Sequence, residues 1–206
     1  MSKNDLYYIF DNSLRRWDSI SRTSDQIYNF KESRQTPGKG WMPSTLACRH
    51  NIAAVGGYSG EYAIVPLNER LNKGVRIGSL AGHVFITNHV DIVEPRQGGV
   101  NVIWANNDCK IRQQDVETGQ FIRIHDLNWA INATSTSPDG RIRAAVGDAK
   151  EVVLMDALRG EVIKELRGHN HWSFAVDWRN DGYTFVTGNQ DMSAKYVSSP
   201  ERSFNM

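Results

Sequence analysis

The feature that most limits the fold of this chain is an internal repeat. His83, His125 and His169 recur at intervals of 42 and 44 residues. After each histidine the same order follows: an alternating run, a turn, a second run, a tight acidic turn, a third run, a glycine turn and, in two copies, a fourth run. A unit of this length has room for one small antiparallel sheet, and repeats of this kind stack on their neighbours to build a continuous core.

The third copy shows the pattern most clearly. Phe174, Val176 and Trp178 alternate with smaller or polar residues, which is typical of a half-buried strand. The turn at residues 180–182 ends in a glycine that can adopt positive φ, and residues 184–187 then form a second strand-like run. No stretch of comparable length has an apolar period of 3.6 residues. We therefore expect an all-β fold of antiparallel four-stranded sheets with few helices.

The repeat also predicts the domain organisation. A weaker copy begins at Trp41, so we expect a repeat domain at residues 41–206 and an N-terminal segment at residues 1–40 that contains a polar linker. Residues 6–10 are expected to form a strand that pairs elsewhere and closes the array. About four units are too few for an ordinary closed propeller, so we expect a fragment or an open array. The expected units are residues 41–81, 82–124, 125–167 and 168–199.

Composition excludes several classes of protein. With 206 residues, 40% hydrophobic and 23% charged, the chain is not mainly disordered, collagen-like or a disulfide-stapled miniprotein. A formal net charge of +1 gives no global field for nucleic acid or an anionic membrane. There is no signal-peptide pattern and no apolar run of about 18–20 residues. Cys48 and Cys109 lack metal-site spacing, so we expect free thiols in the cytoplasm or nucleus.

Several residues together resemble the WD40 repeat family, in particular its fungal members. The likeness covers residues 41–197 and is strongest from Gly168-His169 to Asp191. Turns such as Ser137-Pro138-Asp139-Gly140 are similar to the family's first hairpin turn. The resemblance implies a partial β-propeller of about four blades. It rests on these residues: His83, His125, His169, Asp108, Asp148, Asp191, Asp115 and Asp156.

The resemblance also implies a role for the recurring histidines. In such blades a histidine, an aspartate, a Ser/Thr and a tryptophan form a hydrogen-bonded chain. By carry-over, His169, Asp191 and Thr187 match, but no tryptophan follows. A half-made buried network is costly, so we expect apolar burial between blades to hold the array together. The implied structural pairs are His83 with Asp108, His125 with Asp148, and His169 with Asp191.

We expect no enzyme activity, no cofactor and no metal site. The His–Asp pairs recur once per unit, and no nucleophile motif or phosphate-binding loop accompanies them. A hydrolase that uses one His–Asp pair is the less favoured alternative. Arg141 and Arg143 alternate with apolar residues on one expected strand, and we interpret them as a solvated edge. A nucleic-acid- or chromatin-associated subunit is the other alternative function, and we favour it over the hydrolase.

The remaining function class is surface recognition. Trp129 and Trp172 follow His125 and His169 by four and three residues, and the resemblance places them at the rim of a central channel. Asn107 and Gln190 precede turn aspartates and are expected there too. We predict a non-catalytic scaffold that presents this rim to a protein or peptide partner within a complex. Packing of both tryptophans between blades is the alternative, and open sheet edges could also lead to self-association.

Overall fold

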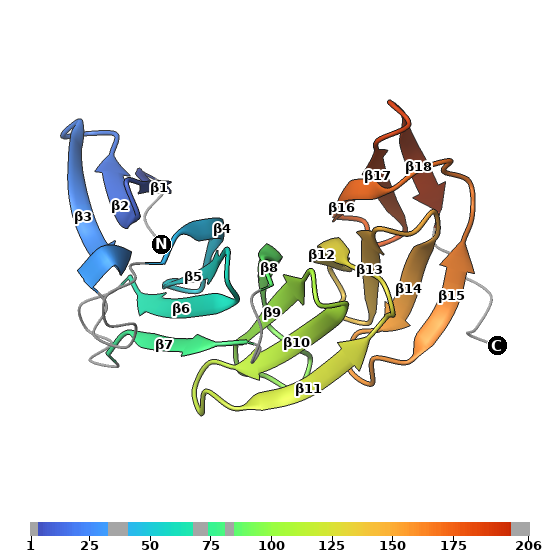
Figure 1. Cartoon of the computed structure of the whole chain (residues 1–206), viewed down its shortest axis with the longest axis horizontal. Coiled ribbons are helices and arrows are strands. Elements are labelled where there is room, and N and C mark those ends of the chain that lie inside the picture. Colours follow the sequence, from blue (N-terminus) through green and yellow to red (C-terminus); the bar gives the residue numbers. More distant parts are fainter. Residues whose placement is uncertain (1–3, 33–40, 68–73, 81–84, 199–206) are drawn as a thin grey trace. The chain divides into compact units, whose positions relative to one another are not determined.

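The computed structural model describes residues 4–32, 41–67, 74–80 and 85–198. Within these residues the chain forms 18 strands in five antiparallel sheets, and the one helical element is a single 3-10 turn, η1, at Phe30–Glu32 (Figure 1). The expected all-β class is confirmed at this level. In the described ranges no helix is long and apolar enough to cross a membrane.

Contacts divide the chain into two compact units, Met1–Ile92 and Val93–Met206. The boundary that we expected after residue 40 lies inside the first unit. Each unit is built from sheets whose strands follow one another in chain order, as in successive hairpins. Hairpins of this kind require only local turns and no long crossover.

The first unit begins with a three-stranded sheet of β1, β2 and β3, followed by a four-stranded sheet of β4, β5, β6 and β7. The strand β8 (Thr87–Val93) ends this unit and is the edge strand of the next sheet. The bounds of the seven strands are Asp5–Phe10, Ser13–Asp18, Thr23–Asn29, Pro43–Arg49, Ile52–Gly57, Glu61–Pro66 and Arg76–Ser79.

The N-terminal sheet differs from our expectation of a lone strand that pairs elsewhere. β1 pairs with β2, with Phe10 opposite Ser13. The two residues between them, Asp11 and Asn12, have φ of 47° and 57°. Positive φ at both central residues defines the tight turn whose twist suits a two-residue hairpin. The chain therefore reverses at once, and residues 5–29 form a fifth sheet instead of a single closing strand.

An aromatic and aliphatic cluster packs the two sheets of the first unit together. Leu14 from β2, Phe30 from η1 and Trp41 are buried with Ala53 and Val55 of β5. The Phe30 and Trp41 ring centroids are 4.5 Å apart with tilted planes, a favourable arrangement for two aromatic rings. Phe30 therefore anchors the η1 turn to this apolar cluster.

The second unit contains three further sheets. Their strand orders are β11-β10-β9-β8, β12-β13-β14-β15 and β16-β17-β18. We call the last of these the C-terminal sheet. The ten strands that begin in this unit are Asn101–Asn106, Lys110–Asp115, Phe121–Asp126, Ile131–Thr136, Ile142–Gly147, Val152–Asp156, Val162–Leu166, Ser173–Trp178, Thr184–Asn189 and Ala194–Ser198, in the order β9 to β18.

Repeated sequence produces repeated turns in this unit. Asp115 ends β10 and its Oδ1 accepts hydrogen bonds from the backbone N and hydroxyl of Thr118 at 2.6 and 2.7 Å. Asp156 ends β14 and accepts from the backbone N of Leu158 and Arg159 at 2.8 and 2.6 Å. Each aspartate therefore satisfies backbone donors of the hairpin that leads to the fourth strand.

Apolar clusters join neighbouring sheets of the second unit. One cluster places Ile103 and Ile111 against Ile131 and Met155, and so joins the β9–β11 region to the β12–β15 sheet. A second cluster places Val146 and Leu154 of that sheet against residues of the C-terminal sheet, which are Val176, Trp178 and Phe185. Burial of these side chains between sheets is the main cohesive contribution that the described contacts show.

Candidate functional site

The C-terminal sheet carries a buried histidine network. His169 Nδ1 lies 3.2 Å from Asp191 Oδ2, and His169 Nε2 lies 2.8 Å from Thr187 Oγ1. The structure therefore brings together the three residues that the family resemblance implied in the third repeat. His169 and Thr187 are both buried, so a substrate has no path to the Thr187 hydroxyl. The arrangement fixes the loop before β16 to the turn after β17.

Asp191 is held as a carboxylate in this network. The Ser193 hydroxyl donates to Asp191 Oδ1, and the backbone N of Asn170 and the His169 ring also contact this carboxylate. These hydrogen bonds, the one from Ser193 above all, lower the pKa of Asp191 far below its ordinary value. The charge on Asp191 therefore persists at any physiological pH and keeps the His169 ring in one orientation.

The structure does not bring His125 and Asp148, the second expected pair, together. His125 lies on β11, the outermost strand of its sheet. A Cβ at Gly160 would lie 1.8 Å from the His125 ring, and the buried His125 Nε2 has no hydrogen-bond partner within the described part of the chain. Asp148 accepts instead from Asn132 Nδ2 at 3.0 Å. β11 continues through Asp126, so His125 is a strand residue. Its ring lies against Gly160 and does not reach Asp148.

The environment of His125 disfavours its charged form. Burial lowers the pKa of His125 first, and the positive charges of Arg143 and Arg123 lower it further. The imidazole is therefore held neutral more firmly than a histidine in water. This side chain packs as a flat ring on Gly160 and does not act as an ion-pairing group.

His83 lies outside the described residues, so its pairing with Asp108 is untested. Asp108 has a strong partner of its own, because Arg112 approaches it with Nη2 at 2.5 Å from Oδ2 and Nη1 at 3.0 Å from Oδ1. Both side chains are 7% exposed. A two-point Arg–carboxylate contact of this kind is a strong and directional ion pair, and it stabilises the turn between β9 and β10.

Among the four expected rim residues, two lie together. Trp172 is 44% exposed at the start of the C-terminal sheet. The backbone N of Gln190 donates to the carbonyl of Trp172 at 2.9 Å, and the Gln190 side chain is exposed. Asn107 is exposed in the turn between β9 and β10. These positions remain open to solvent.

Trp129 differs from Trp172 although both follow a repeat histidine. Trp129 is half-buried and packs against the cluster of Ile103, Ile131 and Met155. A Cβ at Gly147 would lie 2.6 Å from the Trp129 ring, so the indole rests on the bare backbone of that glycine. Trp129 is therefore part of the packing between sheets, while Trp172 is available for contact.

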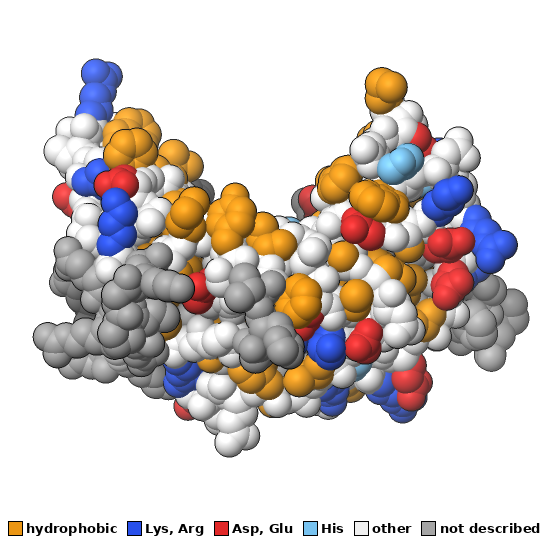
Figure 2. Space-filling model, viewed as in Figure 1, with side chains coloured by type: hydrophobic (Ala, Val, Ile, Leu, Met, Phe, Trp, Pro, Cys, Tyr) orange, Lys and Arg blue, Asp and Glu red, His pale blue; other side chains and the backbone are white. Residues whose placement is uncertain are grey.

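The structure adds two exposed aromatic residues that the sequence analysis did not assign to the site. Phe174 and Tyr196 are 53% and 85% exposed. In the sheet register Tyr196 lies opposite Val186, which lies opposite Asp177, on the face away from the buried Trp178 and Phe185. Figure 2 shows apolar side chains on the visible surface over this sheet. We name Trp172, Phe174 and Tyr196 the C-terminal aromatic surface.

The C-terminal sheet also has an open edge. Within residues 85–198 no strand pairs with the outer side of β18, whereas the two preceding sheets have four strands each. The backbone N of Asn189 donates to the Ser193 carbonyl at 3.1 Å. Inward bonding alternates along an antiparallel strand, so the amides of Ala194, Tyr196 and Ser198 are directed outward. These groups are available to another strand.

The described residues show no metal centre. Within them there is no group of three or more histidine, cysteine, aspartate or glutamate residues that could hold a metal ion. Cys48 and Cys109 are free thiols. Burial raises the pKa of Cys48 to about 11 and also raises that of Cys109, which makes both thiols weak nucleophiles.

Comparison with known proteins identifies a similar fold but no family. No protein-family model matches the chain, and no curated protein matches it. The crystal structure of the computationally designed Ika8 protein is similar, with a TM-score of 0.73 and 16% sequence identity. The match covers 97% of this chain and 57% of the Ika8 chain, so this chain spans little more than half the length of that protein. At this identity the similarity is one of fold alone.

Proposed function

We propose that this protein is a non-catalytic interaction scaffold of the WD40-like propeller type, with its antiparallel sheets as blades. In this proposal a protein partner docks on the C-terminal sheet, through the C-terminal aromatic surface and the outer edge of β18. The observation that supports it most is the asymmetry of this sheet. One face is buried against the β12–β15 sheet, while the other exposes Tyr196 on β18, whose outer edge pairs with no strand within residues 85–198, and Phe174 is exposed on β16.

The mode of binding that fits this edge is strand addition. An extended segment can hydrogen-bond to the outward amides of β18, while pockets and aromatic residues select its alternate side chains. The fourth strands of the two preceding sheets, β11 and β15, indicate what such a segment looks like. Both are short and mix aliphatic residues with a basic residue, as in Phe121–Asp126 and Val162–Leu166. We expect a partner segment of the same composition.

The chemistry of the histidine network supports a scaffold over an enzyme. His169 and Thr187 are hydrogen-bonded to each other and buried, and Asp191 uses its two oxygens for the turn and for the His169 ring. A catalytic dyad needs a nucleophile that a substrate can reach. Tryptophan and tyrosine at a solvent-exposed position, by contrast, are the residues most enriched at binding hot spots.

The direct test is capture of the partner with variants of the surface. The full chain, Trp172→Ala and Tyr196→Ala are used as baits, followed by cross-linking to locate the contact. We expect a specific partner to cross-link beside β18 and to be lost, about tenfold or more, from both variants. Tyr58→Ala is the matched control, because Tyr58 is also exposed but lies in the first unit. Equal loss with Tyr58→Ala, or cross-links elsewhere, would contradict the proposal.

A pair of variants at one position tests the strand-addition mode. Tyr196→Ala removes the ring, and Tyr196→Pro removes the ring together with the outward N–H. Proline is tolerated on an edge strand when its missing N–H faces outward. If the partner adds as a strand, Tyr196→Pro binds more weakly than Tyr196→Ala. Equal binding of the two variants shows that only the side chain matters.

Self-association is a second candidate use of the exposed surfaces. The N-terminal sheet exposes Leu6, Phe10 and Trp17, and by the strand register all three lie on the face away from the buried Leu14. A second copy of this chain is the occupant that this candidate requires. Sedimentation velocity over a range of concentrations tests it. A dimer that dissociates in Phe10→Ser would support it, and a monomer at all concentrations would contradict it.

A further inference from the structure

The second unit contains a cavity of about 360 Å³ whose wall is rich in arginine. Arg96, Arg141 and Arg143 line it together with the amides of Gln97 and Gln113. The carboxylates of Glu94 and Asp156 also belong to the lining, and aliphatic residues such as Leu158 and Ile163 form its apolar part. A concave site with an apolar wall and a few convergent polar groups is the usual form of a small-molecule site.

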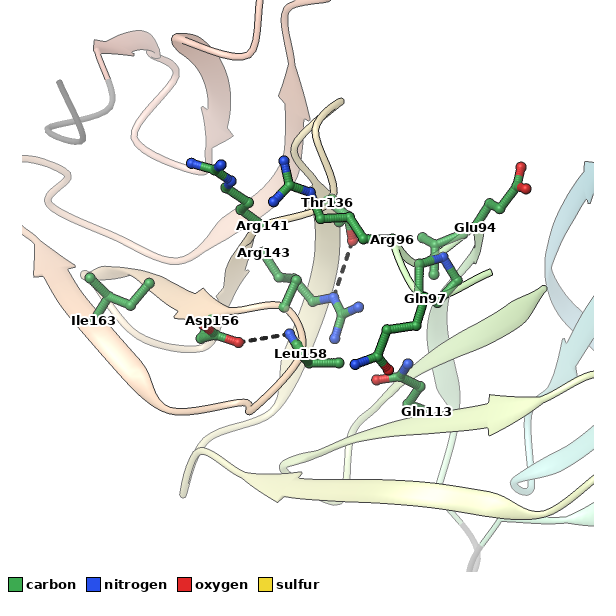
Figure 3. A pocket seen from close by; sticks show the side chains of 14 residues that line it. Glu94, Arg96, Gln97, Gln113, Thr136, Arg141, Arg143, Asp156, Leu158 and Ile163 are labelled. Carbon is green, nitrogen blue, oxygen red and sulfur yellow. Dashed lines mark hydrogen bonds between the residues drawn. The ribbon is translucent and has the colours of Figure 1, made fainter. Parts of the chain in front are cut away.

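Arg143 is the central cation of this cavity. It was expected on a solvated edge, but it is 1% exposed and lies on the central strand β13. Its Nε donates to Thr136 Oγ1 at 3.2 Å, which orients the guanidinium. Figure 3 shows the side chains of Arg143, Gln97 and Gln113 directed toward one another, with Arg96 and Arg141 beyond Arg143. A buried, oriented guanidinium is a strong donor for a carboxylate or phosphate.

Arg96 and Arg141 are anchored to the same turn. Arg96 Nε donates to the carbonyl of Asp139 at 3.0 Å, and Arg141 Nε lies 3.6 Å from Asp139 Oδ2. The carboxylate of Asp156, which also lines the cavity, accepts from backbone donors of its own hairpin. Asp156 therefore serves the turn between β14 and β15, while both arginines keep terminal nitrogens for a ligand.

Gln113 gives a second and independent indication of a ligand. Its side chain is on the central strand β10 and is 2% exposed, yet its Oε1 has no hydrogen-bond partner among the residues that the structure describes. Buried polar atoms are nearly always hydrogen-bonded, because an unmet acceptor costs free energy. An O–H or N–H group in the cavity would satisfy this oxygen.

We infer that this cavity binds a small organic anion, a carboxylate or a phosphate that also bears a hydroxyl or N–H donor. Arg143 binds the anionic group, with Arg96 and Arg141 at the margin, and Gln113 Oε1 accepts from the donor. The aliphatic wall contacts the carbon skeleton. This site is separate from the C-terminal aromatic surface, and it does not depend on the partner proposed above.

Titration of the full chain with citrate, inorganic phosphate and uncharged glucose tests the inference, with calorimetry and protein NMR shifts as readouts. We expect saturable binding of at least one anion and none of glucose, with shifts at Gln113 and Arg143. Tighter binding of citrate identifies a carboxylate site, and tighter binding of phosphate identifies a phosphate site. Absence of saturable binding by both anions would overturn the inference.

Variants then locate the site. Arg143→Gln is expected to lower the affinity for the anion about tenfold to a hundredfold. Because Arg143 is buried, Arg141→Gln provides a second variant at an exposed position, with a smaller loss in the same direction. Arg179→Gln is the matched control, because Arg179 pairs with a turn aspartate, Asp181, at 3.1 Å in the equivalent hairpin but does not line the cavity. Equal weakening by Arg179→Gln, or none by Arg141→Gln and Arg143→Gln, would overturn the inference.

Discussion

Replacement of Trp178 tests how the C-terminal sheet is held to its neighbour. Trp178 is buried in the cluster between the β12–β15 sheet and the C-terminal sheet, with its ring centroid 4.9 Å from that of Phe185. Its Nε1 also donates to the carbonyl of Ser135 at 3.0 Å across the interface. Trp178→Ala removes both contacts and leaves a cavity. We expect a loss of about 3–5 kcal/mol in the free energy of unfolding.

Trp178→Phe separates the two contributions. It keeps an aromatic ring against Phe185 but removes the donor to Ser135. A hydrogen bond contributes about 0.5–1.5 kcal/mol net, and a buried acceptor left unmet costs about 1–3 kcal/mol. We therefore expect a loss of about 1–3 kcal/mol for Trp178→Phe, clearly less than for Trp178→Ala.

Urea unfolding followed by far-ultraviolet circular dichroism measures these losses without depending on tryptophan fluorescence. Trp172→Ala is the control, because Trp172 is the exposed tryptophan of the same sheet. We expect it to change the free energy of unfolding by no more than about 0.5 kcal/mol. If Trp178→Ala costs no more than Trp172→Ala, burial between these sheets is not what holds them together.

Three further predictions concern other parts of the chain. Gly160→Ala is expected to destabilise the protein by more than about 1 kcal/mol, because φ is +75° and the new Cβ would meet the His125 ring. Gly74→Ala, where a new Cβ would meet no described atom within 4 Å, should cost less in the same urea experiment. Because the pKa of His125 is lowered on folding, the unfolded chain takes up this proton first. Stability should therefore fall as the pH drops below about 6.5, and His125→Gln should flatten that part of the pH profile. With a pKa of about 11, Cys48 should be thiolate in only about one molecule in a thousand at pH 8, so iodoacetamide should label it slowly until urea is added. Rapid labelling of the folded protein would contradict its burial.

Much of the fold could be predicted because it rests on local signals. Alternation in residues 173–178 and the turn at residues 180–182 specify a hairpin without reference to the rest of the chain. The contact of His169 with Asp191 and Thr187 was implied by the family resemblance, which is strongest in the repeat that contains all three residues. The N-terminal sheet was missed since its turn, Asp11-Asn12, contains no glycine, although asparagine and aspartate adopt positive φ more readily than most residues.

The candidate site was harder to predict because it depends on neighbours distant in sequence. Trp129 and Trp172 occupy similar places in their repeats, yet Gly147 offers a bare backbone on which only Trp129 packs. Arg143 follows the alternation of a solvent-facing residue, but it is buried and lines a cavity that Gln113 of a neighbouring sheet also lines. Such outcomes are decided by packing between sheets, and periodicity within one strand carries no information about it.

Amide hydrogen exchange of the free protein, read residue by residue by NMR, tests directly whether β18 presents an unoccupied edge. The account predicts alternation along β18: slow exchange at Lys195 and Val197, which bond inward to β17, and fast exchange at Tyr196, whose amide is directed outward. Slow exchange at Tyr196 as well, in dilute protein, would mean that another strand already covers this edge and that no partner can add there.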